Sequence, residues 1–173
     1  MAAVDLAAKI REVPDFPEPG IVFKDFMPLV GDAAALHQAV GELAAWSRTK
    51  EPTLILGAEA RGFILGAAIA CQVGCGFVAA RRPGKLPPET VSATYALEYG
   101  QNSLELHPDA IPEGARVIVH DDLLATGGTV AAISDLVRRL GGEVVGAAFV
   151  IELDFLKGRD RLGGIDIHSL IHY

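Results

Sequence analysis

The sequence predicts an α/β protein in which helices flank a doubly wound, largely parallel sheet. Along the chain, β-branched apolar runs alternate with segments whose apolar residues recur at helical spacing, which is typical of this class. Polar loops follow three of the predicted strands, at residues 57–63, 81–88 and 121–129, and parallel sheets bind ligands at such strand ends. The 173 residues, 50% of them hydrophobic, are enough for one compact domain with a substantial core.

The first thirty residues predict little regular structure. Residues 3–12 predict a short helix, which Pro14 would stop. Residues 15–30 contain three prolines and Gly20, so we expect an irregular segment before Ile21.

The elements that follow alternate in type. Asp32 is a suitable N-cap for a helix that ends near Ser47 and carries apolar residues on one face. After this helix, the pattern predicts a strand at 53–56, a helix at 64–71, a strand at 76–80, two antiparallel strands at 94–99 and 103–107, and late strands at 144–151 and 165–171.

The stretch from Arg116 to Leu140 carries the most informative pattern. The β-branched run at 117–119 predicts a buried strand, and the spaced apolar residues from 130 onward predict a helix capped by Gly141. Small residues between the two let a ligand approach the backbone, and N–H groups of the loop and first helical turn can converge on an anion. The spacing fits neither a Walker loop nor a dinucleotide fingerprint. We therefore predict a phosphate site at Ala125, Thr126, Gly127, Gly128 and Thr129.

Two aspartates, Asp121 and Asp122, precede this loop at the end of the strand. Carboxylates beside a phosphate repel the ligand unless they accept hydrogen bonds from its hydroxyl groups or face a metal. A ribose phosphate supplies a phosphate for the loop and a diol for the aspartates. The alternative is an ordinary strand–turn–helix corner with two capping aspartates. The run DDLLATGGT is more specific, and it resembles the signature with which type I phosphoribosyltransferases bind phosphoribosyl diphosphate (PRPP).

The composition argues against several partners. A net charge of −7, from 15 basic and 22 acidic residues, disfavours nonspecific binding to nucleic acid. We expect no membrane span and no signal peptide, because no long apolar run or basic leader is present. Cys71 and Cys75 lack the spacing of metal ligands, so we expect two buried thiols in a reducing cytoplasm. The high mean hydropathy favours a homodimer that covers apolar surface.

Basic residues follow two other predicted strands. Arg61 lies between a strand and a helix, where it can hold a second phosphate group; the alternative is an ion pair with Glu59 or a surface acid. Arg81, Arg82 and Lys85 form a dense cationic cluster, which is either a solvated loop or a means of neutralising a diphosphate.

Three further residues are candidates for function or for the core. Phe23 lies in the irregular segment, where a core aromatic is unusual, although a core role is the alternative. Glu98, in an apolar-aromatic hairpin, is either a general acid or base on a mobile flap or an outward-facing strand carboxylate. The five histidines show no metal-ligand spacing, and His120 is expected to be buried and hydrogen-bonded.

Together the motifs resemble those of the adenine phosphoribosyltransferases. The segments DFPEPGIVFKDF, GAEARGF, RRPGKLP, YALEYG, HDDLLATGGT and LKGR follow in that family's order over most of the chain. Two departures are Lys24, where the family usually has arginine, and His120, where an aliphatic residue is usual. The resemblance implies a type I phosphoribosyltransferase fold in a single domain, 1–173, with an N-terminal hood at 1–30 and a basic loop and flap at about 81–107.

The resemblance also implies a reaction: transfer of the 5-phosphoribosyl group from PRPP to adenine, giving AMP and diphosphate in cytoplasmic purine salvage. Mg²⁺ would be carried by PRPP and diphosphate, with no metal site in the protein itself, and the Glu59–Ala60 peptide would be cis. The implied contacts are Ala125, Thr126, Gly127, Gly128 and Thr129 with the 5′-phosphate; Asp121 and Asp122 with ribose; Glu59, Ala60, Arg61, Arg81 and Lys85 with diphosphate; Val22, Phe23, Lys24 and Leu156 with adenine; and Glu98 as the catalytic acid or base.

Two other functions share parts of this pattern. A PRPP-binding regulator would need an output module, and we expect no stretch of the chain to be left over for one. An enzyme acting on guanine, hypoxanthine or xanthine would share the PRPP signature. The motifs RRPGKLP and LEYG favour adenine and leave side activity on other purines open.

Overall fold

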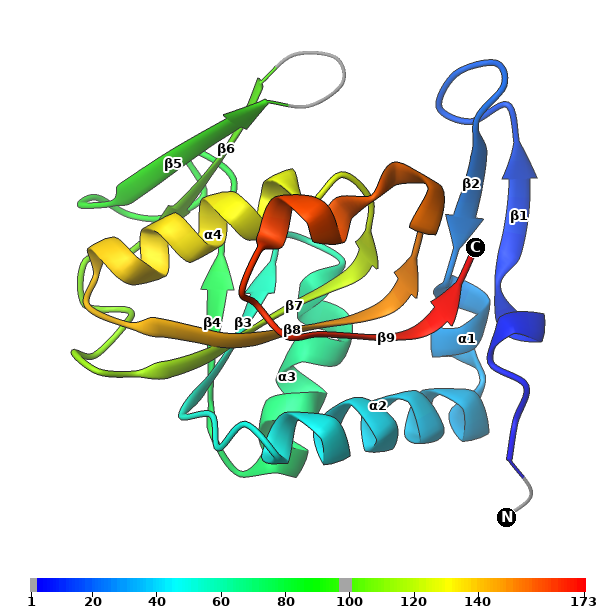
Figure 1. Ribbon diagram of the computed structural model, residues 1–173, viewed down its shortest axis with the longest axis horizontal. Helices are drawn as coiled ribbons and strands as arrows, with labels where there is room; N and C mark the ends of the chain where they lie inside the picture. The colour runs from blue at the N-terminus through cyan, green and yellow to red at the C-terminus, as the bar shows by residue number, and fades with distance from the viewer. Residues whose placement is uncertain (1–2, 97–100) are drawn as a thin grey trace.

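The computed structural model describes residues 3–96 and 101–173, and within them five parallel strands form a central sheet (Figure 1). Their order is β4-β3-β7-β8-β9, and every neighbouring pair is parallel. The strands are β3 (Leu54–Ala58), β4 (Gly76–Ala80), β7 (Arg116–Leu124), β8 (Glu143–Glu152) and β9 (Ile167–His172).

Helices cover both faces of this sheet. On one face α2 (Ala33–Arg48) and α3 (Gly62–Val73) pack through residues such as Leu43 and Ile69 into one buried cluster. On the other face α4 (Gly128–Arg139) packs together with an antiparallel pair, β5 (Val91–Ala96) and β6 (Gln101–Leu106), over a second cluster. The predicted doubly wound α/β class with an antiparallel excursion is therefore confirmed.

Local sequence signals account for the helix ends. The Asp32 carboxylate accepts hydrogen bonds from the backbone N–H groups of Ala34 and Ala35, both at 3.0 Å, and so caps α2 as predicted. Gly141 follows α4 with φ of +89°, a conformation that suits glycine after a helix. Helix α3 begins two residues earlier than predicted, at Gly62.

The N-terminal segment differs from its prediction. The expected helix at 3–12 is wrong: only Ala7–Lys9 (η1) form a 3₁₀ turn, and Arg11–Pro14 form strand β1. Strand β1 pairs antiparallel with β2 (Val22–Asp25), and a short helix α1 (Met27–Gly31) follows. The prolines keep the turn between the strands irregular, as expected. The strands themselves depend on pairing with each other, which neither segment shows alone.

The expectation of two buried cysteines is also wrong. Cys71 is exposed and Cys75 half-buried, and both are free thiols. Helix α3 is apolar on more than one side, but only the side with Leu65, Ile69 and Ala70 packs against the sheet. None of the helices in the described part of the chain is long and apolar enough to cross a membrane.

His120 lies in the middle of β7 and is buried, as predicted, but only one of its two ring nitrogens has a hydrogen-bond partner among the described residues. Its Nδ1 is 2.9 Å from the Ala148 carbonyl oxygen, so Nδ1 carries the proton and donates. Its Nε2 is buried and has no hydrogen-bond partner among the described residues. Burial lowers the pKa of His120 from 6.5 to about 4, although the bond to Ala148 opposes this. The imidazole is therefore neutral at physiological pH.

We predict that His120→Val makes folding less sensitive to acid. Because the folded pKa lies below that of the unfolded chain, stability is fully present above the unfolded pKa and is lost as the pH falls toward about 4. Between about pH 7 and about pH 5 the wild type should lose about 2 kcal/mol more free energy of unfolding than the variant. Chemical denaturation of both proteins at the two pH values measures the difference, and equal losses would contradict the assignment.

Candidate active site

Three loops meet at the carboxyl-terminal edge of the sheet. Strand β4 runs into Arg81, β3 into Glu59 and Arg61, and β7 into Ala125. Because β4, β3 and β7 are consecutive in the sheet, these loops lie next to one another. The sequence-based expectation that the polar loops gather at strand ends therefore holds in the fold.

The loop between β7 and α4 encloses a small cavity. Its volume is about 100 Å³, and its lining runs from Asp121 through the loop to Val130. Gly127 has a φ of +78° and precedes the first turn of α4, so the helix N-terminus faces the cavity. The N–H groups of a first helical turn and the helix dipole favour an anion at such a position, and all five residues predicted to hold a phosphate line the cavity.

A second segment packs against the back of this loop. It contains two 3₁₀ turns, η2 (Asp154–Leu156) and η3 (Gly158–Leu162). A Cβ atom on Gly127 would lie 2.6 Å from the Gly158 carbonyl oxygen, and one on Gly158 would overlap the Ala125 carbonyl oxygen. The backbone at Gly158 is therefore in direct contact with the backbone of the loop between β7 and α4. The shape of this loop depends on the segment that contains η2 and η3.

The aspartate pair lies within the last part of β7. Asp122 is almost fully buried, and its Oδ2 is 3.0 Å from Arg61 Nε. Asp121 is half-buried, and its Oδ1 accepts a hydrogen bond from the Asp122 N–H at 2.9 Å. Burial, and then the adjacent Asp122 charge, raises the pKa of Asp121 well above its usual range; burial also raises the pKa of Asp122 against the opposing effect of Arg61.

Arg61 makes an ion pair, but not the one that the sequence suggested. Its ion-pair partner is the buried Asp122, not Glu59 or a surface acid. Glu59 is instead bound by Arg81 Nε at 3.0 Å and by the Arg82 N–H at 2.7 Å. The hydrogen bond from the Arg82 N–H, followed by Arg81, lowers the pKa of Glu59.

The predicted diphosphate residues thus lie on adjoining loops. The Glu59–Ala60 peptide is cis, as the resemblance implied. Arg81 is half-buried, whereas Lys85 is exposed on the loop that follows β4.

The predicted adenine residues lie on two other elements. Phe23, on β2, is half-buried with its ring centroid 5.4 Å from Arg61 Cζ, and Phe16 packs against it edge-on at 5.3 Å. The fully buried aromatics of the core include Phe26, three residues further along the chain, and not Phe23. Leu156 is half-buried on η2. Glu98, the predicted acid or base, lies outside the described residues.

Comparisons with known proteins agree with this geometry. Residues 30–163 match the family model of the phosphoribosyl transferase domain. Adenine phosphoribosyltransferase from Rubrobacter xylanophilus is 54% identical over 166 residues, which cover 95% of this chain and 90% of the relative. The crystal structure of adenine phosphoribosyltransferase from Thermoanaerobacter pseudethanolicus superposes with a TM-score of 0.95 at 51% identity, covering 98% of each chain.

This chain belongs to the adenine phosphoribosyltransferase family.

A more distant family member was crystallised with a base bound. The enzyme from Saccharomyces cerevisiae, in complex with an imino-altritol bisphosphate and adenine, has a TM-score of 0.88 at 38% identity and covers 96% of both chains. The shared fold therefore persists at lower identity.

An ion pair between the exposed Arg159 and the buried Glu152, which sequence reasoning missed, fixes the segment that packs behind the loop between β7 and α4. Arg159 donates two hydrogen bonds to the Glu152 carboxylate, at 2.6 and 2.7 Å, and Ser169 Oγ donates a third at 2.6 Å. Burial alone would raise the pKa of Glu152, but Arg159 and Ser169 lower it. The LKGR motif contains Arg159, yet its partner on β8 is visible only in the fold.

The same corner holds a small cluster of acidic and histidine side chains. Ligand atoms of Glu152, Asp154 and His172 lie within 4.8 Å of one another. However, the Glu152 carboxylate already binds Arg159, and His172 Nδ1 lies 2.9 Å from Asp154 Oδ1. These contacts account for the cluster as one ion pair and one hydrogen bond.

We predict that Gly127→Ala weakens binding of PRPP, the ligand that the motif indicates, by about ten-fold or more. The added Cβ meets both an unfavourable φ, costing about 1–2 kcal/mol, and the Gly158 carbonyl at 2.6 Å. Calorimetric titration with PRPP measures the affinity, and thermal unfolding checks that the variant folds. The matched control is Gly74→Ala, where φ is also positive, at +89°, but no atom lies within 4 Å. Unchanged affinity in folded Gly127→Ala would disprove the phosphate assignment.

Proposed function

We propose that this chain transfers the 5-phosphoribosyl group of PRPP to N9 of adenine, giving AMP and diphosphate in purine salvage. Its membership in the adenine phosphoribosyltransferase family supports this reaction. The structural observation that carries the proposal is the juxtaposition of a phosphate-sized cavity, a carboxylate pair and an arginine on adjoining loops. These are the groups that a ribose carrying a phosphate at one end and a diphosphate at the other requires.

Each end of the ribose would be held by a different part of the site. The loop from Ala125 to Thr129 binds the 5′-phosphate at the N-terminus of α4, and the carboxylates of Asp121 and Asp122 accept hydrogen bonds from the ribose hydroxyls. Holding both ends aligns the anomeric carbon with the incoming base, which lowers the entropic part of the barrier. The carboxylates also face the positive charge that develops on the ribose as the C–O bond breaks.

The departing diphosphate would meet Arg61, Arg81 and Lys85, with Glu59 and Ala60 shaping the loop. Mg²⁺ fits as an ion carried in by PRPP, because these side chains are cationic and Glu59 is already bound to Arg81 and Arg82. The bound ion would neutralise charge on the diphosphate oxygens. Arg61 would have a partner with and without ligand. Its guanidinium compensates the charge of Asp122 before the diphosphate binds, and the diphosphate afterwards.

Adenine would lie between the Phe23 ring and Leu156, with edge contacts from the backbones of Val22 and Lys24. Phe23 is half-buried and already carries a guanidinium near its ring, as expected of a face that accepts a planar group. Glu98, which comes between β5 and β6 in the sequence, would accept or share the proton of the imidazole nitrogens of adenine as the new bond forms.

A nucleotide-formation assay tests the reaction. The protein is incubated with Mg²⁺, PRPP and each of adenine, guanine, hypoxanthine and xanthine in turn, and the product is identified by chromatography and mass spectrometry. We expect AMP from adenine as the dominant product. Faster product formation from another base would assign the enzyme to that base. PRPP binding without product from any base would instead support a regulator.

We predict that Glu98→Gln lowers kcat by roughly 10²-fold or more while PRPP affinity and Tm change little. Glutamine keeps the size and much of the hydrogen bonding of glutamate but lacks its basicity. Single-turnover measurements isolate the chemical step from product release. Turnover equal to that of the wild type would leave catalysis to positioning and diphosphate neutralisation.

We also propose that the chain, as one catalytic domain spanning 1–173, forms a cytoplasmic homodimer. The outward side of α3 presents an apolar stripe at helical spacing, made of Ile64, Ala67, Ala68 and Cys71, all exposed. Such a stripe fits a second copy of the same helix. Both cysteines are free thiols, which suits a reducing compartment.

Light scattering tests the assembly. We expect twice the single-chain mass of 18.2 kDa at micromolar concentration. Ala68→Glu, which places a charge in the middle of the stripe, should shift the protein toward monomer, whereas Gln72→Glu beside the stripe should not. A wild-type mass near that of one chain would contradict the homodimer.

A further inference from the structure

The two-stranded sheet of the N-terminal segment is anchored at its base, where Ile10 before β1 and Phe26 after β2 are buried in the core, whereas no residue within the two strands is fully buried. Within the described residues, β1 and β2 pair with each other and with no strand of the central sheet. Figure 1 shows the pair standing beside the body, with its turn pointing away from the helices. A lone two-stranded sheet is marginally stable in water, so its position depends on the side-chain contacts it makes with the body.

Two such contacts involve neighbouring residues of β2. Successive residues of a strand point to opposite sides, so Phe23 and Lys24 face different surroundings. Phe23 receives the Arg61 guanidinium, 5.4 Å from its ring centroid. Lys24 places its ammonium 3.6 Å from the centroid of the Tyr173 ring.

The Lys24 contact is the closer and the better shielded of the two. Only 12% of the Lys24 side chain is exposed, and the ammonium also pairs with Glu12 on the facing strand. A cation held over an aromatic face contributes more when it is desolvated. The contact therefore ties β2 firmly to Tyr173.

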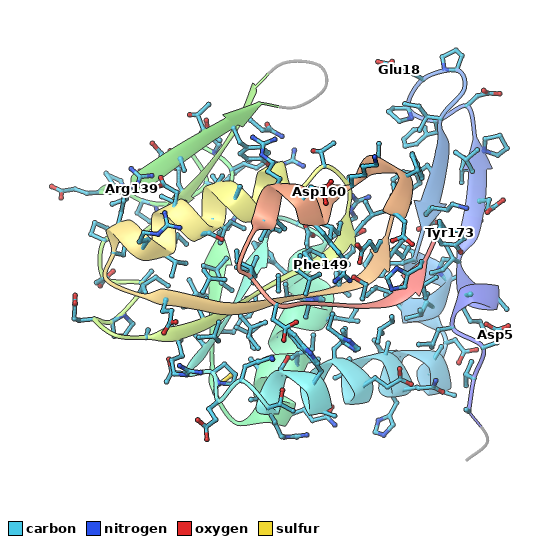
Figure 2. The ribbon with its side chains drawn as sticks, viewed as in Figure 1. Asp5, Glu18, Arg139, Phe149, Asp160 and Tyr173 are labelled. Carbon is cyan, nitrogen blue, oxygen red and sulfur yellow. The ribbon has the colours of Figure 1, made fainter. Side chains whose placement is uncertain are left out.

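Tyr173 is itself fixed to the sheet. Its N–H donates to the Glu152 carbonyl at 3.0 Å, and its carbonyl accepts from the Asp154 N–H at 2.9 Å. The half-buried ring packs against the cluster that contains α2 and α3. Figure 2 shows Tyr173 at the end of β9, beside the N-terminal strands. Tyr173 thus connects β2 with η2, the turn that carries Leu156.

The contact between Arg61 and Phe23, in contrast, uses groups that would also bind the substrates. The guanidinium that lies against Phe23 also pairs with Asp122 at 3.0 Å. A diphosphate entering the site competes for the same guanidinium, and an adenine ring competes for the same face of Phe23. When both substrates are present, the contact of Lys24 with Tyr173 is not competed for, and it holds the strand itself, beyond the anchor that the buried Phe26 gives to the end of β2.

We propose that Tyr173 is a positioning residue, which holds Phe23 over the adenine site by binding Lys24 through its ring. The inference rests on the proposed function, since it takes adenine as the group that Phe23 meets. Tyr173 touches neither substrate and acts through β2. Its loss should therefore affect adenine and leave PRPP unaffected.

The test compares Tyr173→Leu with Tyr173→Phe in steady-state kinetics. Leucine keeps an apolar side chain but removes the aromatic face, whereas phenylalanine keeps the face and loses only the hydroxyl. We expect Tyr173→Leu to raise the KM for adenine about five-fold, the effect of losing one partly shielded cation–π contact, with the KM for PRPP within about two-fold of wild type. Tyr173→Phe should match the wild type in both.

A double-mutant cycle with Lys24→Met shows whether the two residues act through each other. We expect Lys24→Met to raise the KM for adenine to a similar extent, and the double variant to be no worse than either single one. Glu12→Gln, which removes the ion pair but leaves the cation–π contact, is the matched control and should have little effect. If Tyr173→Leu fails to fold, Lys24→Met and the control carry the test.

The outcomes separate the inference from the function on which it rests. An unchanged KM for adenine in both variants, or equal rises in the KM for adenine and for PRPP, would overturn the role of Tyr173 while wild-type AMP formation stands. Absence of AMP formation by the wild type would overturn the proposed function itself.

Discussion

Asp122 lies almost fully buried at the carboxyl-terminal edge of the sheet, and a charge in that position requires compensation. Arg61 provides it, with Nε 3.0 Å from Oδ2. The same guanidinium lies against the Phe23 ring, so one side chain joins the end of β7, the start of α3 and the N-terminal strands. Gly62, the first residue of α3, makes this possible: a Cβ atom there would lie 2.6 Å from the His120 carbonyl, so the helix starts directly against β7. Arg61 thus links the aspartate pair at the end of β7 with Phe23 on β2.

The parts of the fold that the sequence predicted are those determined by short-range patterns. The strands at 76–80 and 144–151 and the helices after Asp32 and Gly127 depend on β-branched runs, amphipathic spacing and caps, which are local. The loop between β7 and α4 was predicted for the same reason, because DDLLATGGT places its strand end, small residues and helix start in one run. The strands β1 and β2 could not be predicted in this way, since each becomes a strand only by pairing with the other.

Partners of charged side chains were the least predictable feature of the site. Arg61 was expected either to bind a ligand or to pair with a nearby acid, and in the fold it reaches Asp122, sixty-one positions away in the chain. Arg159 reaches back to Glu152 because the chain reverses through η2 and into the start of η3. Ser169 on β9 donates a further hydrogen bond to the same carboxylate. Cys71 was expected to be buried because it lacks the spacing of a metal ligand, whereas the sheet covers only one side of α3 and leaves this thiol exposed. Hydrophobicity indicates that a surface is to be covered but not whether the sheet or another chain covers it.

The charge of the aspartate pair, and the groups that compensate it, would affect the rate of the proposed reaction. His120, directly before the pair in β7, is kept neutral by burial and supplies no positive charge. Burial and mutual repulsion raise the pKa of Asp121, which shows that its ionised form is poorly stabilised without a ligand. If a diphosphate draws Arg61 away, the pair loses its counter-charge at the moment that ribose hydroxyls and a developing positive ribose arrive beside it. The carboxylates are then compensated best in the transition state, and an interaction that strengthens between ground state and transition state is one that raises kcat.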